Sequence, residues 1–125
     1  MALIEKFEEI RAWQEARILT RQIYALTRIG QLSKDFGLRD QLQRASVSVM
    51  ANIAEGFDCD SHKEFARFLG IARRSAVEVQ SPLYICLVLH YITHQQFDTS
   101  YQQALKAKRT VHALKQSVEK RANTT

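Results

Sequence analysis

The sequence predicts an all-α protein, an antiparallel up-down-up-down four-helix bundle in a single domain. A chain of 125 residues has the length of one domain. Its 4 glycines and 1 proline are too few for the frequent turns of β-sandwiches and barrels. Apolar residues recur at three- and four-residue steps in four segments, and short polar stretches separate them. Long helices joined by short loops lie antiparallel to their neighbours.

The first helix is predicted over residues 7–29. Gly30 follows it as a C-terminal cap, and the polar segment 31–37 is predicted to be a loop. The apolar face of this helix consists of Ile10, Trp13, Ala16, Thr20, Ile23 and Thr27.

The second helix is predicted over residues 38–55, with Gly56 just beyond its end. Between Ala45 and Ala54 it is apolar around most of its circumference, which is typical of a helix surrounded by protein. We expect the extra apolar surface to contact another subunit; the alternative is a central helix in a monomer. The expected interface residues are Val47, Met50, Ala51 and Ala54.

A polar column also follows this second helix at four-residue steps. We expect it to form a hydrogen-bond network facing the third helix, with Glu78 as a candidate partner, or to pair along the surface. Its members are Asp40, Arg44, Ser48 and Asn52, and Glu55 continues it.

The third and fourth helices are predicted over residues 62–89 and 94–121. Each begins with a capping box, Ser61 to Glu64 in one and Thr93 to Gln96 in the other. Pro82 lies within the third helix, and we expect a kink there because the apolar periodicity continues past it.

The net charge of +5 is confined to one end of the sequence. Residues 1–100 carry 12 basic and 12 acidic side chains, whereas residues 101–125 carry six basic side chains against Glu119 alone. Such asymmetry favours a polyanionic partner, and the alternative is a solvated helix face. The expected nucleic-acid-binding residues are Lys106, Lys108, Arg109, Lys115, Lys120 and Arg121, with Arg17, Arg21 and Arg28 extending the surface. Because no aromatic residue follows Tyr101, we expect phosphate contacts rather than base stacking.

No motif for catalysis, a metal or a cofactor is recognisable. The di-iron sites of helical bundles need Glu-x-x-His pairs, and the chain has none. His90 and His94 straddle a predicted helix end, and the run from Asp58 to His62 is explained by loop solubility and capping. The sequence therefore predicts a non-enzyme with no cofactor, metal or catalytic residues.

No targeting segment or membrane span is predicted. The longest apolar run, residues 83–89, is far shorter than a bilayer requires. With two cysteines and no apolar signal core, the sequence predicts a cytoplasmic protein.

Several of these segments resemble a known family. The chain resembles the four-helix-bundle proteins encoded in intervening sequences of bacterial large-subunit ribosomal RNA genes. The resemblance is carried by the signature block Asn52-Ile53-Ala54-Glu55-Gly56, together with Phe36-Gly37-Leu38, the run 40–48, Trp13 and Lys63-Glu64-Phe65. His90 stands where those proteins commonly have glycine. The resemblance implies a ring-like homopentamer without established catalytic residues. One branch resembles the accessory variability determinant of diversity-generating retroelements, which implies binding to nucleic acid and a reverse transcriptase.

We therefore expect a homo-oligomeric accessory protein that contacts RNA, DNA or a nucleic-acid enzyme through its basic surface. The alternative is a protein–protein scaffold whose charge only aids solubility.

Overall fold

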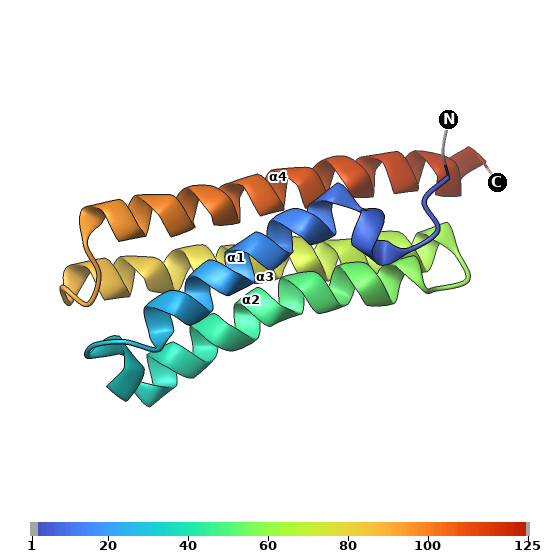
Figure 1. Cartoon of the computed structure of the whole chain (residues 1–125). Helices are drawn as coiled ribbons and strands as arrows, with labels where there is room; N and C mark the ends of the chain where they lie inside the picture. Colours follow the sequence, from blue (N-terminus) through green and yellow to red (C-terminus); the bar gives the residue numbers. More distant parts are fainter. Residues whose placement is uncertain (1–2, 125) are drawn as a thin grey trace.

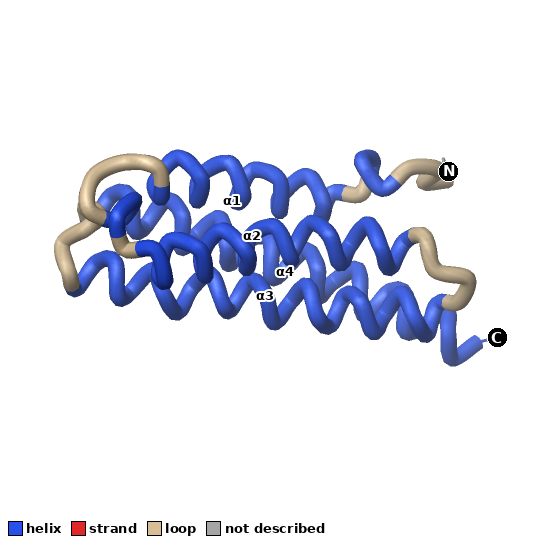
Figure 2. The backbone as a smooth tube through the Cα atoms, turned by 90° about the horizontal axis from the view of Figure 1, so that it is seen from below, coloured by secondary structure: helices blue, strands red, loops and turns tan. Residues whose placement is uncertain are grey.

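The computed structural model describes residues 3–124, and the side chains of residues 3–123. Within that range four α-helices form a bundle in which each helix contacts the next one in sequence, and α1 also contacts α4 (Figure 1). The helices alternate in direction, so both ends of the chain lie at one end of the bundle (Figure 2). The predicted fold class is confirmed, and no helix among the described residues is long and apolar enough to span a bilayer.

The predicted first helix is divided in two. A short 3-10 helix, η1, covers Phe7–Glu9, and the α-helix α1 covers Arg11–Thr27. Ile10 between them is extended, with ψ of 123°, and its side chain is buried in the core. The helix is thus interrupted where the Ile10 side chain enters the core. The periodicity of apolar residues in the sequence does not reveal this break. At the other end Gly30 has φ of +62°, which lets the chain turn after α1.

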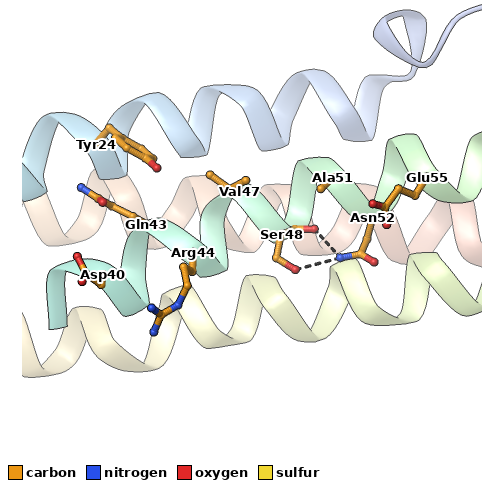
Figure 3. Close-up of a pocket in the computed structure, with 9 residues that line it drawn as sticks. All are labelled: Tyr24, Asp40, Gln43, Arg44, Val47, Ser48, Ala51, Asn52 and Glu55. Carbon is orange, nitrogen blue, oxygen red and sulfur yellow. Dashed lines mark hydrogen bonds between the residues drawn. The ribbon is translucent and has the colours of Figure 1, made fainter. Parts of the chain in front are cut away.

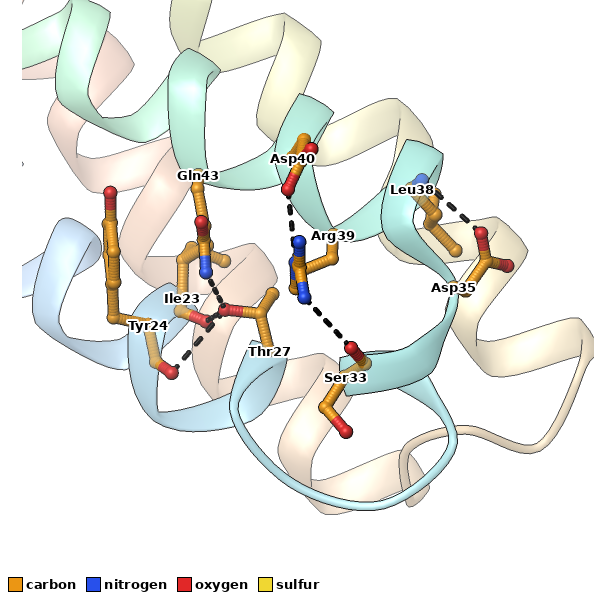
Figure 4. Close-up of polar contacts among 9 residues, drawn as sticks. All are labelled: Ile23, Tyr24, Thr27, Ser33, Asp35, Leu38, Arg39, Asp40 and Gln43. Carbon is orange, nitrogen blue, oxygen red and sulfur yellow. Dashed lines mark hydrogen bonds and ion pairs between the residues drawn. The ribbon is translucent and has the colours of Figure 1, made fainter.

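The segment predicted as a loop before the second helix contains structure of its own. Leu32–Lys34 form a 3-10 helix, η2, and Leu32 is buried. The second helix, α2, covers Phe36–Phe57, and the Asp35 carboxylate accepts from the Leu38 N–H at 3.3 Å to cap it. Around this turn Arg39 donates to Asp40 and to the Ser33 carbonyl, each at 3.0 Å (Figure 4).

Gly56 does not terminate α2, as the sequence suggested, but lies inside its last turn and is buried. A Cβ atom at this position would lie 2.8 Å from the Phe68 Cβ and 2.9 Å from the Phe65 Cδ1. Glycine is therefore required here because α2 and the next helix approach each other closely.

The third helix, α3, covers His62–Val88, and the fourth, α4, covers His94–Thr124. The Ser61 hydroxyl accepts from the Glu64 N–H at 3.1 Å, whereas the Glu64 carboxylate pairs with Arg67 instead of returning to Ser61. The Thr93–Gln96 box is complete, with hydrogen bonds of 2.9 and 3.1 Å in the two directions. α3 continues through Pro82 for six further residues.

α3 ends in a left-handed turn at His90, where φ is 59°. The Tyr91 N–H donates to the Cys86 carbonyl at 2.9 Å and the His90 N–H to the Leu87 carbonyl at 3.1 Å. This is the hydrogen-bond pattern that glycine most readily supports at a helix end. A residue with a side chain therefore occupies a backbone conformation that suits glycine better.

The core consists of two clusters along the bundle axis. One surrounds Leu19, Ile23, Leu42 and Leu83, towards the end that carries the α1–α2 and α3–α4 connections. The other surrounds Ala16, Val49, Ile53, Leu69 and Val111. Burial of these small and branched side chains aligns the four helices, so their outward faces are available for binding.

Candidate nucleic-acid interface

The seam between α1 and α4 is built around a buried carboxylate. Glu15 is 8% exposed and accepts a hydrogen bond of 2.9 Å from the Gln103 side chain, which also donates to the Glu15 carbonyl at 2.8 Å. Lys106 lies 3.5 Å and Arg11 3.8 Å from the Glu15 carboxylate. A buried carboxylate needs such partners, so these contacts fix the register of α4 against α1.

The basic residues of α4 divide between two faces. Lys106, Arg109, Lys120 and Arg121 are exposed, as expected for an outward column. Lys115 is half-buried, pairs with Glu119 at 3.0 Å, and lies on the α3 side, where its Cε would be 3.4 Å from a Cβ at Gly70. Lys108, seven residues earlier, shares that side and is also half-buried. The structure thus brings Lys106, Arg109 and Lys120 together as the outer surface of α4.

The basic residues of α1 alternate with aromatic rings. Arg17, Arg21 and Arg28 are exposed, and the Arg17 guanidinium lies over the Trp13 ring at 5.9 Å from its centroid. The Arg28 guanidinium lies over the Tyr24 ring at 5.6 Å. This pattern on α1 was not expected from the sequence, although the four-residue spacing of each pair is visible there.

A groove of about 550 Å³ runs along the outward side of α2 (Figure 3). All five residues of the polar column line it, and the Ser48 and Ser75 hydroxyls are hydrogen-bonded at 2.8 Å. Asn52 donates to Ser48, so part of the predicted network exists: it joins Ser48 and Asn52 to Ser75 of α3 rather than to Glu78. The lining residues are Tyr24, Asp40, Gln43, Arg44, Val47, Ser48, Ala51, Asn52 and Glu55.

The expected interface residues of α2 do not share one environment. Val47 is 42% exposed and Ala51 is half-buried, and both line the groove. Ala54 is half-buried as well, whereas Met50 packs against the second core cluster. In the signature block, Ile53 belongs to the core and Gly56 permits the close approach of α3, so much of that block maintains the bundle.

An exposed apolar stripe on α3 was not expected from the sequence. Val77, Tyr84, Ile85 and Val88 are 45%, 51%, 49% and 72% exposed. Tyr84 is anchored by rings of α4, at 4.8 Å from Phe97 and 5.6 Å from Tyr101. The spacing of these residues could have revealed the stripe, because steps of seven, eight and eleven return to one helix face.

Two findings describe the groups of residues 3–124 that could hold a metal or act as a thiol. No group of three or more His, Cys, Asp or Glu side chains there is arranged to hold a metal ion. Burial, with the nearby Asp35 charge, raises the pKa of the Cys86 thiol to about 11, which keeps it protonated at neutral pH. Cys59 is half-buried, and its thiol donates to the Glu55 carbonyl at 3.4 Å.

Comparison with known proteins gives a family and a matching fold. The family model described as 23S rRNA-intervening sequence protein matches residues 8–113, so the chain belongs to this family. A protein of unknown function from the S23 ribosomal protein family of Bacteroides thetaiotaomicron VPI-5482 has a similar solved structure. Its TM-score is 0.75 at 22% identity, over 82% of this chain and 96% of that one. No curated protein matches the chain.

Proposed function

We propose that this member of the 23S rRNA-intervening sequence protein family is a non-enzymatic, homo-oligomeric accessory protein that binds nucleic acid through α1 and α4. One observation carries the proposal: the exposed ionic side chains of these two helices are nearly all basic. The two helices contain three acidic residues: Glu15, which is buried, and Asp98 and Glu119, which lie near the ends of α4. The cations are Arg11, Arg17, Arg21, Lys106, Lys108, Arg109, Lys115, Lys120 and Arg121.

Surface charge of this kind is suited to a phosphate backbone. Glu15 offsets part of the charge of Arg11 and Lys106, so the Arg109 and Lys120 side chains and the α1 arginines provide the main outward field. Each cation that contacts a phosphate releases a counterion, which makes binding strongly dependent on salt. On α4 these contacts are expected to be sequence-tolerant, because no Phe, Trp or Tyr follows Tyr101 in the sequence to stack a base.

The test is a salt titration of nucleic-acid binding by fluorescence anisotropy. We expect tight binding at low salt, and a variant with Lys106, Arg109 and Lys120 changed to Gln should lower the slope of log K against log salt by about 2 for single strands. A matched variant carries Gln at Lys63, Arg73 and Arg74, which are exposed on α3. If the two variants behave alike, or if the parent protein binds neither RNA nor DNA at low salt, the nucleic-acid proposal is wrong.

Self-association is supported by the apolar stripe of α3 and the outward side of α2. The two surfaces lie on different faces, so a contact between them would be heterologous, and repetition of such a contact around an axis closes a ring. The large side chains Tyr84 and Ile85 would pack against the small residue Ala51 and against Val47 of the next copy. Following the family resemblance, we propose five copies.

Light scattering after size-exclusion chromatography tests this assembly. The parent protein should have a mass several times 14.4 kDa. Val47→Asp and Ile85→Asp should each dissociate it, because the new carboxylate would be desolvated without a partner. Arg109→Asp, on the outer face of α4, serves as the control that should leave the mass unchanged. A monomeric parent protein would contradict the proposal.

A reverse transcriptase is the protein partner that we propose from the family resemblance. Copurification of the two recombinant proteins in low and high salt tests it. If the chain assembles and binds neither nucleic acid nor polymerase, the scaffold alternative replaces the accessory function.

A further inference from the structure

We infer that the outward face of α1 selects single-stranded nucleic acid over duplex by stacking unpaired bases. This inference rests on the nucleic-acid binding proposed above and assigns a ligand class to one part of that surface. The face consists of Trp13, Arg17, Arg21, Tyr24 and Arg28, which we call the arginine–aromatic face. Its arginines are exposed and its two rings are half-buried, with Trp13 also packed against the second core cluster. Steps of four, four, three and four residues place them on one side of the helix, over a length of about 22 Å.

Four of the five side chains of this face contact an aromatic ring or a guanidinium group before any ligand binds. Trp13 packs edge-on against Phe7 at a centroid distance of 5.3 Å, and Arg17 lies over its ring at 5.9 Å. Arg28 lies over Tyr24 at 5.6 Å. Aromatic rings and guanidinium groups are both planes on which bases stack, and a guanidinium also donates in pairs to a phosphate. Fixed side chains lose less entropy on binding than free ones.

No carboxylate opposes an anionic strand along the centre of this face. Residues 16–31 contain no acid, and Glu15 is turned into the α4 seam, where Gln103 and Lys106 hold it. Asp40 lies across the groove from Tyr24 (Figure 3), but Arg39 donates to it at 3.0 Å. A phosphate backbone following α1 therefore meets three exposed arginines.

Duplexes and single strands offer different chemistry to this surface. In a duplex the base faces are stacked on one another, so only phosphates and groove edges are available. A single strand also offers its base faces, which the rings and the three guanidinium groups of α1 can stack. The outer surface of α4 has only the guanidinium of Arg109 beside the ammonium groups of Lys106 and Lys120. The outer surface of α4 therefore attracts any polyanion, and the arginine–aromatic face discriminates between the two forms.

The decisive variant keeps the charge of this face and removes its guanidinium planes. Arg17, Arg21 and Arg28 are changed together to Lys, and binding is measured with uridine and thymidine homopolymers and with a duplex of equal phosphate number. The matched control changes Arg67, Arg73 and Arg74 of α3 to Lys; like the α1 arginines, it includes a guanidinium over a ring, Arg67 over Phe68 at 4.6 Å. The α1 variant should lose about tenfold in affinity for single strands, the loss of one base stack, with no change in salt slope or duplex binding.

A second measurement needs no variant. Trp13 is the only tryptophan of the sequence, so its fluorescence reports directly on the arginine–aromatic face. Single strands should quench it in proportion to the bound fraction, whereas duplex bound to α4 should not. Circular dichroism of each variant establishes that the bundle is folded.

The outcomes separate this inference from the proposed function. If the parent protein binds single strands and duplex equally, or if the α1 lysine variant binds like the parent protein, the stacking inference is wrong and the nucleic-acid function stands. If the parent protein prefers duplex, the inference is overturned as well. If the parent protein binds no nucleic acid at low salt, both are wrong.

Discussion

Replacing Gly56 with alanine should destabilise the bundle even though alanine is the better helix former. The new Cβ would lie 2.8 Å from the Phe68 Cβ, 2.9 Å from the Phe65 Cδ1 and 3.3 Å from the Phe65 carbonyl oxygen. Two of these atoms, a Cβ and a backbone oxygen, cannot move away by a simple side-chain rotation, so α2 and α3 must separate. Overpacking of this kind costs about 1–3 kcal/mol, against a helix-propensity gain of about 0.5–1 kcal/mol. We expect a net loss of about 1–2 kcal/mol.

The control is in the same helix. Gly37 lies in the first turn of α2, and a Cβ there would meet no atom within 4 Å. Gly37→Ala should therefore leave stability unchanged or raise it by up to about 1 kcal/mol. Urea denaturation followed by circular dichroism measures both variants, at one protein concentration because association contributes to stability. If Gly56→Ala is as stable as Gly37→Ala, the close approach of the two helices is not what requires glycine.

The remaining predictions concern the end of α3, the start of α4 and the buried thiol. His90→Gly should raise the free energy of unfolding by about 1 kcal/mol, because φ of 59° strains a residue with a side chain; a lower urea midpoint would contradict this. Thr93→Ala should lower it by about 1 kcal/mol by removing the cap of Gln96, whereas Thr93→Ser should not. Because burial raises the pKa of Cys86 from 9.0 to about 11, the folded state keeps a proton that the unfolded state loses. Its contribution to stability is complete below pH 9 and declines as pH rises towards 11, and iodoacetamide should label Cys59 first in the native protein.

Local signals in the sequence predicted the helices well, and tertiary contacts account for the differences. The hydroxyls of Ser61 and Thr93 identified two helix starts, because capping depends on residues three positions apart. The break at Ile10 and the burial of Leu32 depend on contacts with distant residues, so periodicity did not reveal them. Gly56 was interpreted as a stop signal, yet its role depends on the side chains that α3 places beside it.

The candidate site was predictable in its charge and less so in its shape. The exposure of Arg17 and Arg109 followed from helical spacing. Lys115 was expected to belong to the basic surface, but its half-buried position against Gly70 depends on how α4 is rotated towards α3. The apolar stripe on α3 was missed because residue type does not distinguish a core valine from the 72% exposed Val88. Only the bundle geometry separates these two environments.

The charge distribution has a further consequence, because the outer cations of α1 and α4 repel one another in the free protein. The ion pairs Arg39–Asp40 and Arg67–Glu64 neutralise parts of α2 and α3, whereas Glu15 is the carboxylate at the α1–α4 seam. Added salt screens repulsion among the exposed cations, so the urea midpoint of the free protein should rise between low and physiological ionic strength. The same salt should weaken nucleic-acid binding, because counterions released into a more concentrated salt solution gain less entropy. Opposite salt responses of stability and affinity are therefore expected from one set of side chains. If salt lowers the urea midpoint instead, the attraction within surface ion pairs is stronger than the repulsion among the exposed cations. The excess of cations on α1 and α4 then does not destabilise the free protein.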